Sequence, residues 1–210
     1  WQAGAPLDYS GSGGNLTLDA AGYIQLNSNI TTGSGGLTLK ANTGFVEAAR
    51  GVTLNLNGPL EVSTGDARIG TPGFSAPELA AMLTGSGDLT KTGNGRLILS
   101  GSSSTWSGST DVKEGTLRVS GANALGTAAP TRIQTPATLE LAGGISLAEN
   151  IELEGGTLTN WSGDNTVTSP LLLKSSAFVD ARQGSLTLDP SAGNAVAVDV
   201  ATSAYNSDLT

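Results

Sequence analysis

The chain has 210 residues, of which 30 are Gly, 4% are aromatic and 13% are charged, and its formal net charge is −8. This charge disfavours nucleic acid as a partner, because nucleic-acid binding depends on basic patches. The chain contains neither His nor Cys, which excludes Ser-His-Asp triads, thiol chemistry and zinc sites built on these ligands. The composition therefore predicts no cofactor and no metal, and it suits an all-β fold with many narrow turns.

Short Leu-x-Leu units recur along the chain at intervals of about 20 residues. Examples are Leu16-Thr17-Leu18, Leu37-Thr38-Leu39, Leu97-Ile98-Leu99, Leu117-Arg118-Val119 and Leu139-Glu140-Leu141. The alternation places the outer residues of each unit on one face of a strand. One such strand cannot bury its apolar face alone, but stacked coils can. The pattern predicts one continuous parallel β-helix, or β-solenoid, over 1–210, as a fragment of a longer polypeptide.

Residues 1–74 carry short strands between Gly- and Asn-rich turns, and residues 75–84 interrupt them. Ser75 and Glu78 fit a helix capping box, and Pro77 is tolerated in a first helical turn. Leu79 and Met82 then begin an apolar stripe at helical spacing. We expect a short helix near 76–84, docked sideways on the solenoid.

Residues 85–125 have the most distinctive local sequence. Asn94-Gly95 between two apolar strands is typical of a hairpin, but a solenoid corner requires the same residue types. The coil-length spacing of Leu97, Leu117 and Leu139 favours the corner. No run of the roughly 18 apolar residues that a spanning helix needs occurs, so we expect no membrane insertion of this segment.

The block Gly85–Val119 resembles the autotransporter-associated β-strand repeat. The shared residues are Gly85-x-Gly87-x-Leu89-Thr90-Lys91-x-Gly93-x-Gly95, Leu97-x-Leu99-x-Gly101, Trp106-x-Gly108 and Gly115-Thr116-Leu117-x-Val119, with Trp106 where Tyr is usual and Arg96 where Thr is usual. Residues 85–210 resemble passenger coils of this kind. Residues 10–84 resemble filamentous haemagglutinin-like coils, so we divide the solenoid into haemagglutinin-like coils over 1–74, the short docked helix over 75–84 and autotransporter-repeat coils over 85–210. Both resemblances imply a right-handed β-helix exported across the Gram-negative outer membrane.

Trp106 and Trp161 are the candidate ligand-contact residues, because both lie in similar Trp-Ser-Gly turns. An aromatic ring on a rod offers a large contact area for a glycan at a small entropic cost. The structural alternative is that each ring packs over a corner and shields the core. No catalytic residue is predicted.

The leading functional hypothesis is a non-catalytic segment of a large secreted or cell-surface adhesin that attaches to cells or biofilm matrix. Its implied partners are a host-cell or bacterial surface, a matrix polysaccharide, and an outer-membrane β-barrel transporter during autotransporter or two-partner secretion. One alternative is a carbohydrate-binding module, and another is a polysaccharide-degrading β-helix enzyme. The enzyme would need carboxylates beside Arg or Lys in a groove, and the pair Asp180 and Arg182 is more typical of a surface ion pair.

Overall fold

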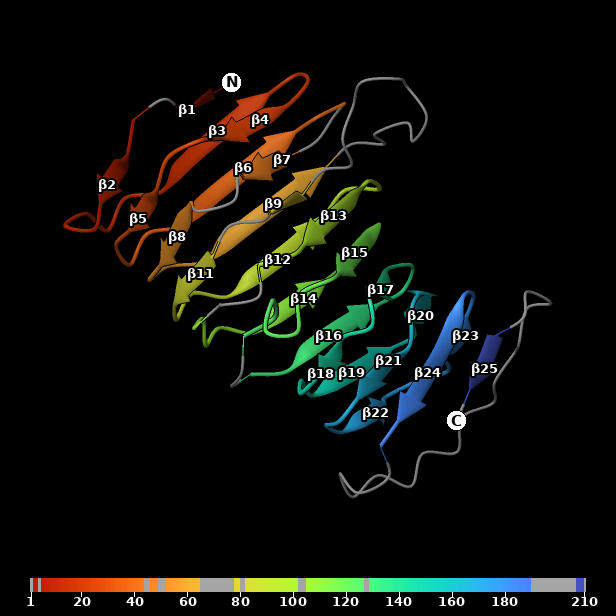
Figure 1. The fold of residues 1–210 in the computed structure, drawn as a ribbon. Coiled ribbons are helices and arrows are strands. Elements are labelled where there is room, and N and C mark those ends of the chain that lie inside the picture. The colour runs from red at the N-terminus through yellow and green to blue at the C-terminus, as the bar shows by residue number, and fades with distance from the viewer. Residues whose placement is uncertain are drawn as a thin grey trace.

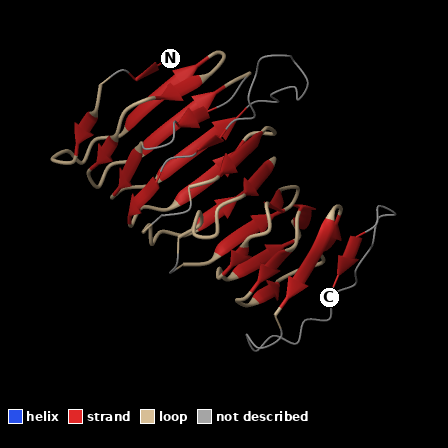
Figure 2. Cartoon of the chain, viewed as in Figure 1, coloured by secondary structure: helices blue, strands red, loops and turns tan. Residues whose placement is uncertain are grey.

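A computed structural model describes residues 2–3, 5–43, 46–48, 52–64, 78–79, 82–101, 105–126, 129–189 and 207–209. In these parts the chain is all-β, and every strand pairing between named strands is parallel. Figure 2 shows strands joined by loops, with no helix in the described part. Figure 1 shows the strands stacked along an elongated body, with β1 and β2 at one end and β24 and β25 at the other. The predicted parallel β-solenoid is confirmed.

Four sheets make up the walls of the solenoid. Sheet A runs in the order β1 (Gln2–Ala3), β4 (Ile24–Leu26), β7 (Val46–Ala48), β10 (Glu78–Leu79), β13 (Arg96–Leu99), β15 (Thr116–Val119), β17 (Thr138–Ala142), β20 (Thr157–Ser162) and β23 (Phe178–Ala181). Sheet B is β11 (Met82–Gly85), β8 (Thr53–Leu56), β5 (Ile30–Thr32) and β2 (Leu7–Tyr9). Sheet C is β22 (Leu171–Leu173), β19 (Ile151–Glu154), β16 (Thr131–Gln134), β14 (Thr110–Val112), β12 (Leu89–Thr92), β9 (Leu60–Thr64), β6 (Leu37–Ala41) and β3 (Leu16–Ala20). Sheet D is β18 (Ser146–Leu147), β21 (Asn165–Val167), β24 (Gly184–Leu188) and β25 (Ser207–Leu209).

The core consists of aliphatic columns that run along the stack, because equivalent residues of successive turns are in register. One column in sheet A contains Leu97, Leu117, Leu139, Leu158 and Val179. All five side chains are buried. Each such side chain contributes about 2 kcal/mol through burial. The Leu-x-Leu spacing therefore gives both the length of each turn and the inward face of each strand.

A column of glycines allows the turns to stack closely at the corner between sheets B and C. A Cβ atom added at Gly58 would overlap the carbonyl oxygen of Gly35, and one at Gly87 would overlap that of Gly58. In the same way, a Cβ atom at Gly35 would overlap the carbonyl oxygen of Gly14, and one at Gly108 would overlap that of Gly87. The requirement at this corner is close backbone approach rather than a left-handed conformation.

The segment Gly93-Asn94-Gly95 is a solenoid corner and not a hairpin. It connects β12 in sheet C to β13 in sheet A, so the two strands do not pair with each other. Gly93 has a φ of 72°, which favours glycine. Its amide donates a hydrogen bond to the Glu114 carboxylate of the next turn at 3.0 Å.

The short helix predicted near 76–84 is wrong for the described residues, which form strands. Glu78–Leu79 is β10, which pairs with β13 and β7, and Met82–Gly85 is β11, which pairs with β8. In β11 the Met82 side chain is exposed and the Leu83 side chain is buried, an alternation with the period of a strand. Pairing with strands already in place satisfies the backbone here and overrides the local helical signal. Residues 75–77 and 80–81 lie outside the described residues.

Candidate functional site

Trp106 lies in the core. Its segment follows β11, the last strand of sheet B, and precedes β18, the first strand of sheet D, and is not itself in a described strand. Its side chain is fully buried, and its Nε1 donates a hydrogen bond to the carbonyl oxygen of Gly87. The flanking backbone runs beside β11, since the Thr105 amide donates to Leu83 at 3.1 Å and the Ser107 amide to Gly85 at 3.0 Å. The indole thus fills the interior at this level. The glycan contact predicted at Trp106 has no exposed ring through which to act.

Lys91 is also fully buried, and it occupies a position in an aliphatic column of sheet C between Val62 and Val112. Its ammonium group donates to the carbonyl oxygens of Thr92 at 2.6 Å, Gly93 at 2.8 Å and Glu114 at 3.3 Å. Burial lowers the pKa of Lys91 to about 8, and the nearby Glu114 carboxylate opposes that shift. Lys91 therefore connects two successive corners of the solenoid, at Gly93 and at Glu114, by hydrogen bonds to their backbone carbonyl oxygens.

Trp161, in contrast to Trp106 and Lys91, lies outside the core, on the outer face of sheet A. Leu141 pairs with Asn160 and Ala142 pairs with Ser162, so Trp161 is the extra residue of a β-bulge in β20. A bulge re-aims the side chain that it carries. Three guanidinium groups surround the indole: the Cζ of Arg118 lies 4.3 Å from the ring centroid, that of Arg96 5.3 Å and that of Arg182 5.5 Å. Such distances are typical of cation–π contacts.

Glu140 holds two of these arginines in place. Its Oε2 lies 2.7 Å from a terminal nitrogen of Arg118 and 3.2 Å from Nε of Arg96, and the Glu140 side chain is 7% exposed. Burial lowers the pKa of Arg118, while the Glu140 carboxylate opposes the shift. We call Arg96, Arg118, Glu140, Trp161 and Arg182 the arginine–tryptophan cluster. It connects β13, β15, β17, β20 and the residue after β23 across the outside of sheet A.

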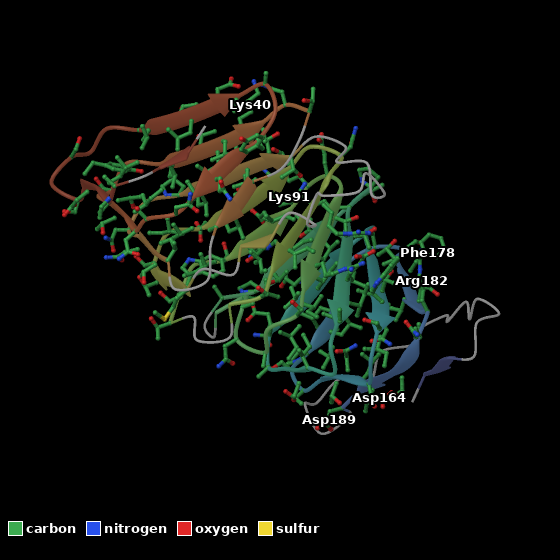
Figure 3. The ribbon with its side chains drawn as sticks, turned by 45° about the horizontal axis from the view of Figure 1, so that its top comes forward. Lys40, Lys91, Asp164, Phe178, Arg182 and Asp189 are labelled. Atoms are coloured by element: carbon green, nitrogen blue, oxygen red, sulfur yellow. The ribbon has the colours of Figure 1, made fainter. Side chains whose placement is uncertain are left out.

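The most exposed large apolar side chain of the described residues lies on the same sheet as this cluster, at the start of β23. Phe178 is 66% exposed and is paired in register with Thr157. On the same strand the Asp180 carboxylate forms an ion pair with Arg182 at 2.9 Å, as expected for a surface pair. Phe178 begins β23 and Arg182 directly follows it, four residues further along. Figure 3 shows both on the outside of the stack, whereas Lys91 lies among the strands.

Comparison with known families identifies the segment that contains Trp106 and Lys91. Residues 89–119 match the family model described as the passenger-associated-transport-repeat. The chain carries a repeat of the autotransporter passenger type. This confirms the repeat predicted over Gly85–Val119. No curated protein and no solved structure matches the chain.

The transport repeat supplies one turn of the solenoid and the first two strands of the next turn, β14 and β15. It begins at β12 and ends at β15, and Lys91 and Trp106 are its two largest fully buried side chains. The arginine–tryptophan cluster includes residues on the outer face of β13 and β15, which belong to the repeat, and extends over later turns. The haemagglutinin-like interpretation of residues 10–84 stays a prediction.

Two other kinds of feature are not found in the part of the chain that the structure describes. No group of three or more acidic side chains in that part of the chain is placed to hold a metal ion. Nor does any helix there have the length and apolar character needed to cross a membrane.

Glu149 is a buried carboxyl group that the sequence pattern did not reveal. It is 3% exposed, and the Thr131 hydroxyl donates a hydrogen bond to its Oε1 at 3.3 Å. Burial raises the pKa of Glu149 to about 7, from a usual value of 4.5. The folded state therefore holds this proton more tightly than the unfolded state does.

We expect the free energy of unfolding to fall as the pH rises from 4.5 to 7, because the buried Glu149 must ionise over this range. The size of this effect is on the order of 3 kcal/mol. Glu149→Gln should remove this part of the pH dependence, as measured by chemical denaturation at several pH values. Glu61→Gln, which removes the same charge from an exposed position, is the matched control for the substitution itself. A Glu149→Gln profile identical to that of the wild type would contradict the assignment.

Proposed function

We propose that this chain is a non-catalytic segment of a large secreted or surface-displayed bacterial adhesin that attaches to cells or to biofilm matrix. The observation that carries the proposal is a passenger-type transport repeat built into a parallel solenoid. Such a rod presents long, repetitive outer faces, which suit adhesion or the support of an adhesive region. The absence of His and Cys from the sequence supports the non-catalytic part of the proposal.

The repeat indicates a secreted or surface location. We propose further that the segment reaches this location through an outer-membrane β-barrel transporter. The autotransporter route, in which the barrel belongs to the same polypeptide, is the form that the matched repeat supports. The proposed partners at the destination are a host-cell surface, a bacterial surface or a matrix polysaccharide.

The test compares bacteria that display the parent protein with bacteria that display it without residues 1–210. Surface display of both forms is first verified by accessibility to added protease. The proposal predicts that loss of the segment lowers attachment to cells and to biofilm at equal display. Attachment that is unchanged at equal display would overturn it. Inhibition of wild-type attachment by added purified chain would show that the segment itself binds, whereas no inhibition would favour a stalk.

A second candidate is a carbohydrate-binding role on the surface of the solenoid. It is favoured by the two aromatic side chains, Trp161 and Phe178, on the outer face of sheet A. Of the two tryptophans predicted to contact a glycan, only Trp161 is at the surface. This role is compatible with the adhesin proposal, since a glycan is one of the proposed partners.

A further inference from the structure

We propose that the outer face of sheet A between Arg96 and Phe178 binds an extended acidic polysaccharide. The inference rests on the proposed carbohydrate-binding role and names the class of glycan. A sugar ring would lie on Phe178, and an anionic substituent would bind Arg182. The arginine–tryptophan cluster would supply the surrounding positive potential.

Basic residues are concentrated at this face of an otherwise acidic chain. The chain has 10 Lys and Arg residues against 18 Asp and Glu residues, yet three arginines surround one indole. Two carboxylates, Glu140 and Asp180, pair with them, so the cluster retains one net positive charge. The Arg182 side chain is 54% exposed, which leaves much of its guanidinium group accessible. A guanidinium group binds carboxylate or sulfate oxygens through two parallel hydrogen bonds.

A column of polar side chains on the outer face of sheet A runs along the solenoid axis and forms a polar track. The register places Arg96, Thr116, Thr138, Thr157 and Phe178 in one outward column over five successive strands. Strands about 4.8 Å apart make this column about 19 Å long. The three threonines are half-buried. The exposed Phe178 ring stands at one end of these hydroxyl groups, and from the other end the Arg96 guanidinium extends to Glu140 and the Trp161 ring. Hydroxyl groups flanked in this way suit a hydroxyl-rich, anionic polymer.

Of the two aromatic rings on this face, Phe178 is free to contact a sugar, whereas the Trp161 ring is already covered by guanidinium groups. Guanidinium groups already lie against the Trp161 ring, so its main role in the site is to fix the arginines. Phe178 is 66% exposed and stands at the end of the track, on a rigid sheet. A rigid aromatic side chain gives contact area with little loss of conformational freedom.

The test measures binding of the purified chain to dextran sulfate, polygalacturonate and neutral dextran by calorimetry. We expect both acidic polymers to bind more tightly than dextran. Phe178→Ala and Arg182→Gln should each weaken binding about tenfold. Lys174→Gln is the matched control, because it removes one positive charge from an ion-paired side chain that is 50% exposed and directly follows β22 of sheet C. It should change affinity less than about twofold. Circular dichroism verifies the fold of each variant.

Three results would overturn the inference, and they are distinguishable. Equal weakening by Arg182→Gln and Lys174→Gln would mean attraction by charge alone, without a site on sheet A. Equal affinity for dextran and dextran sulfate would refute the acidic specificity and leave the carbohydrate-binding role standing. No binding to any of the three polymers would refute that role as well, while the adhesin proposal would still be decided by attachment of the bacteria.

Discussion

Replacing Leu117 with Asp is expected to unfold the turns around the transport repeat. Leu117 is fully buried and lies between Leu97 and Leu139 in the sheet A column. An isolated carboxylate at this position has no cationic partner within the column, and burying it costs several kcal/mol in addition to the lost apolar contacts. The total stability of a domain is only about 5–15 kcal/mol. Because each turn of a solenoid contacts only its neighbours, the damage should centre on β13, β15 and β17.

Chemical denaturation and amide hydrogen exchange measure this effect and its location. Thr116→Asp is the matched control, since Thr116 precedes Leu117 on β15 and faces outward. It should shift the midpoint far less than Leu117→Asp does. Equal midpoints for the two variants would mean that the inward and outward faces of β15 have been assigned incorrectly.

The length of the turns could be predicted from the sequence because one physical requirement repeats. Leu97, Leu117 and Leu139 are 20 and 22 positions apart in the sequence, and the structure pairs them directly. The same register predicts that Arg118 lies beside Glu140, and their ion pair was therefore within reach of sequence analysis. What this spacing could not reveal is the β-bulge in the next strand, β20, that turns Trp161 toward Arg118.

Lys91 and residues 78–84 show where local pattern and tertiary context diverge. Lys91 has the inward parity of Leu89, so a charged residue on the inner face was a readable sign of a buried cation. Its partners are backbone carbonyls of two corners, which no residue pattern identifies. Across residues 75–84 the capping residues and the apolar stripe favour a helix, but pairing with β13 and β8 makes strands of the described residues 78–79 and 82–84.

Trp106 and Trp161 have similar turn contexts in the sequence but different positions in the structure. Both residues precede Ser and Gly, so sequence alone could not separate a buried ring from an outward one. The difference lies in the sheet beneath: Trp161 belongs to β20, while no described strand occupies the level of Trp106 between sheets B and D. An indole can fill a space of that size, and its N–H finds the carbonyl oxygen of Gly87.

Replacing Trp106 with Ala should therefore destabilise the chain more than any exposed aromatic substitution. Loss of a fully buried Trp typically costs about 3–5 kcal/mol, because a cavity remains that the surrounding walls fill only partly. The carbonyl oxygen of Gly87 would also lose its buried donor. The expected result is a lower denaturation midpoint together with faster hydrogen exchange in β11 and β14, the strands adjoining the Trp106 segment.

Two further variants separate the two contributions of the indole. Trp106→Phe keeps most of the ring volume and removes the N–H donor, so its loss of stability should lie between those of the wild type and Trp106→Ala. Phe178→Ala removes an aromatic ring that is 66% exposed, and it should change stability by less than about 1 kcal/mol. If Trp106→Ala were no more destabilising than Phe178→Ala, the indole could not be the side chain that closes the interior at the transport repeat. Destabilisation of Trp106→Phe as large as that of Trp106→Ala would instead assign the main contribution to the hydrogen bond with Gly87.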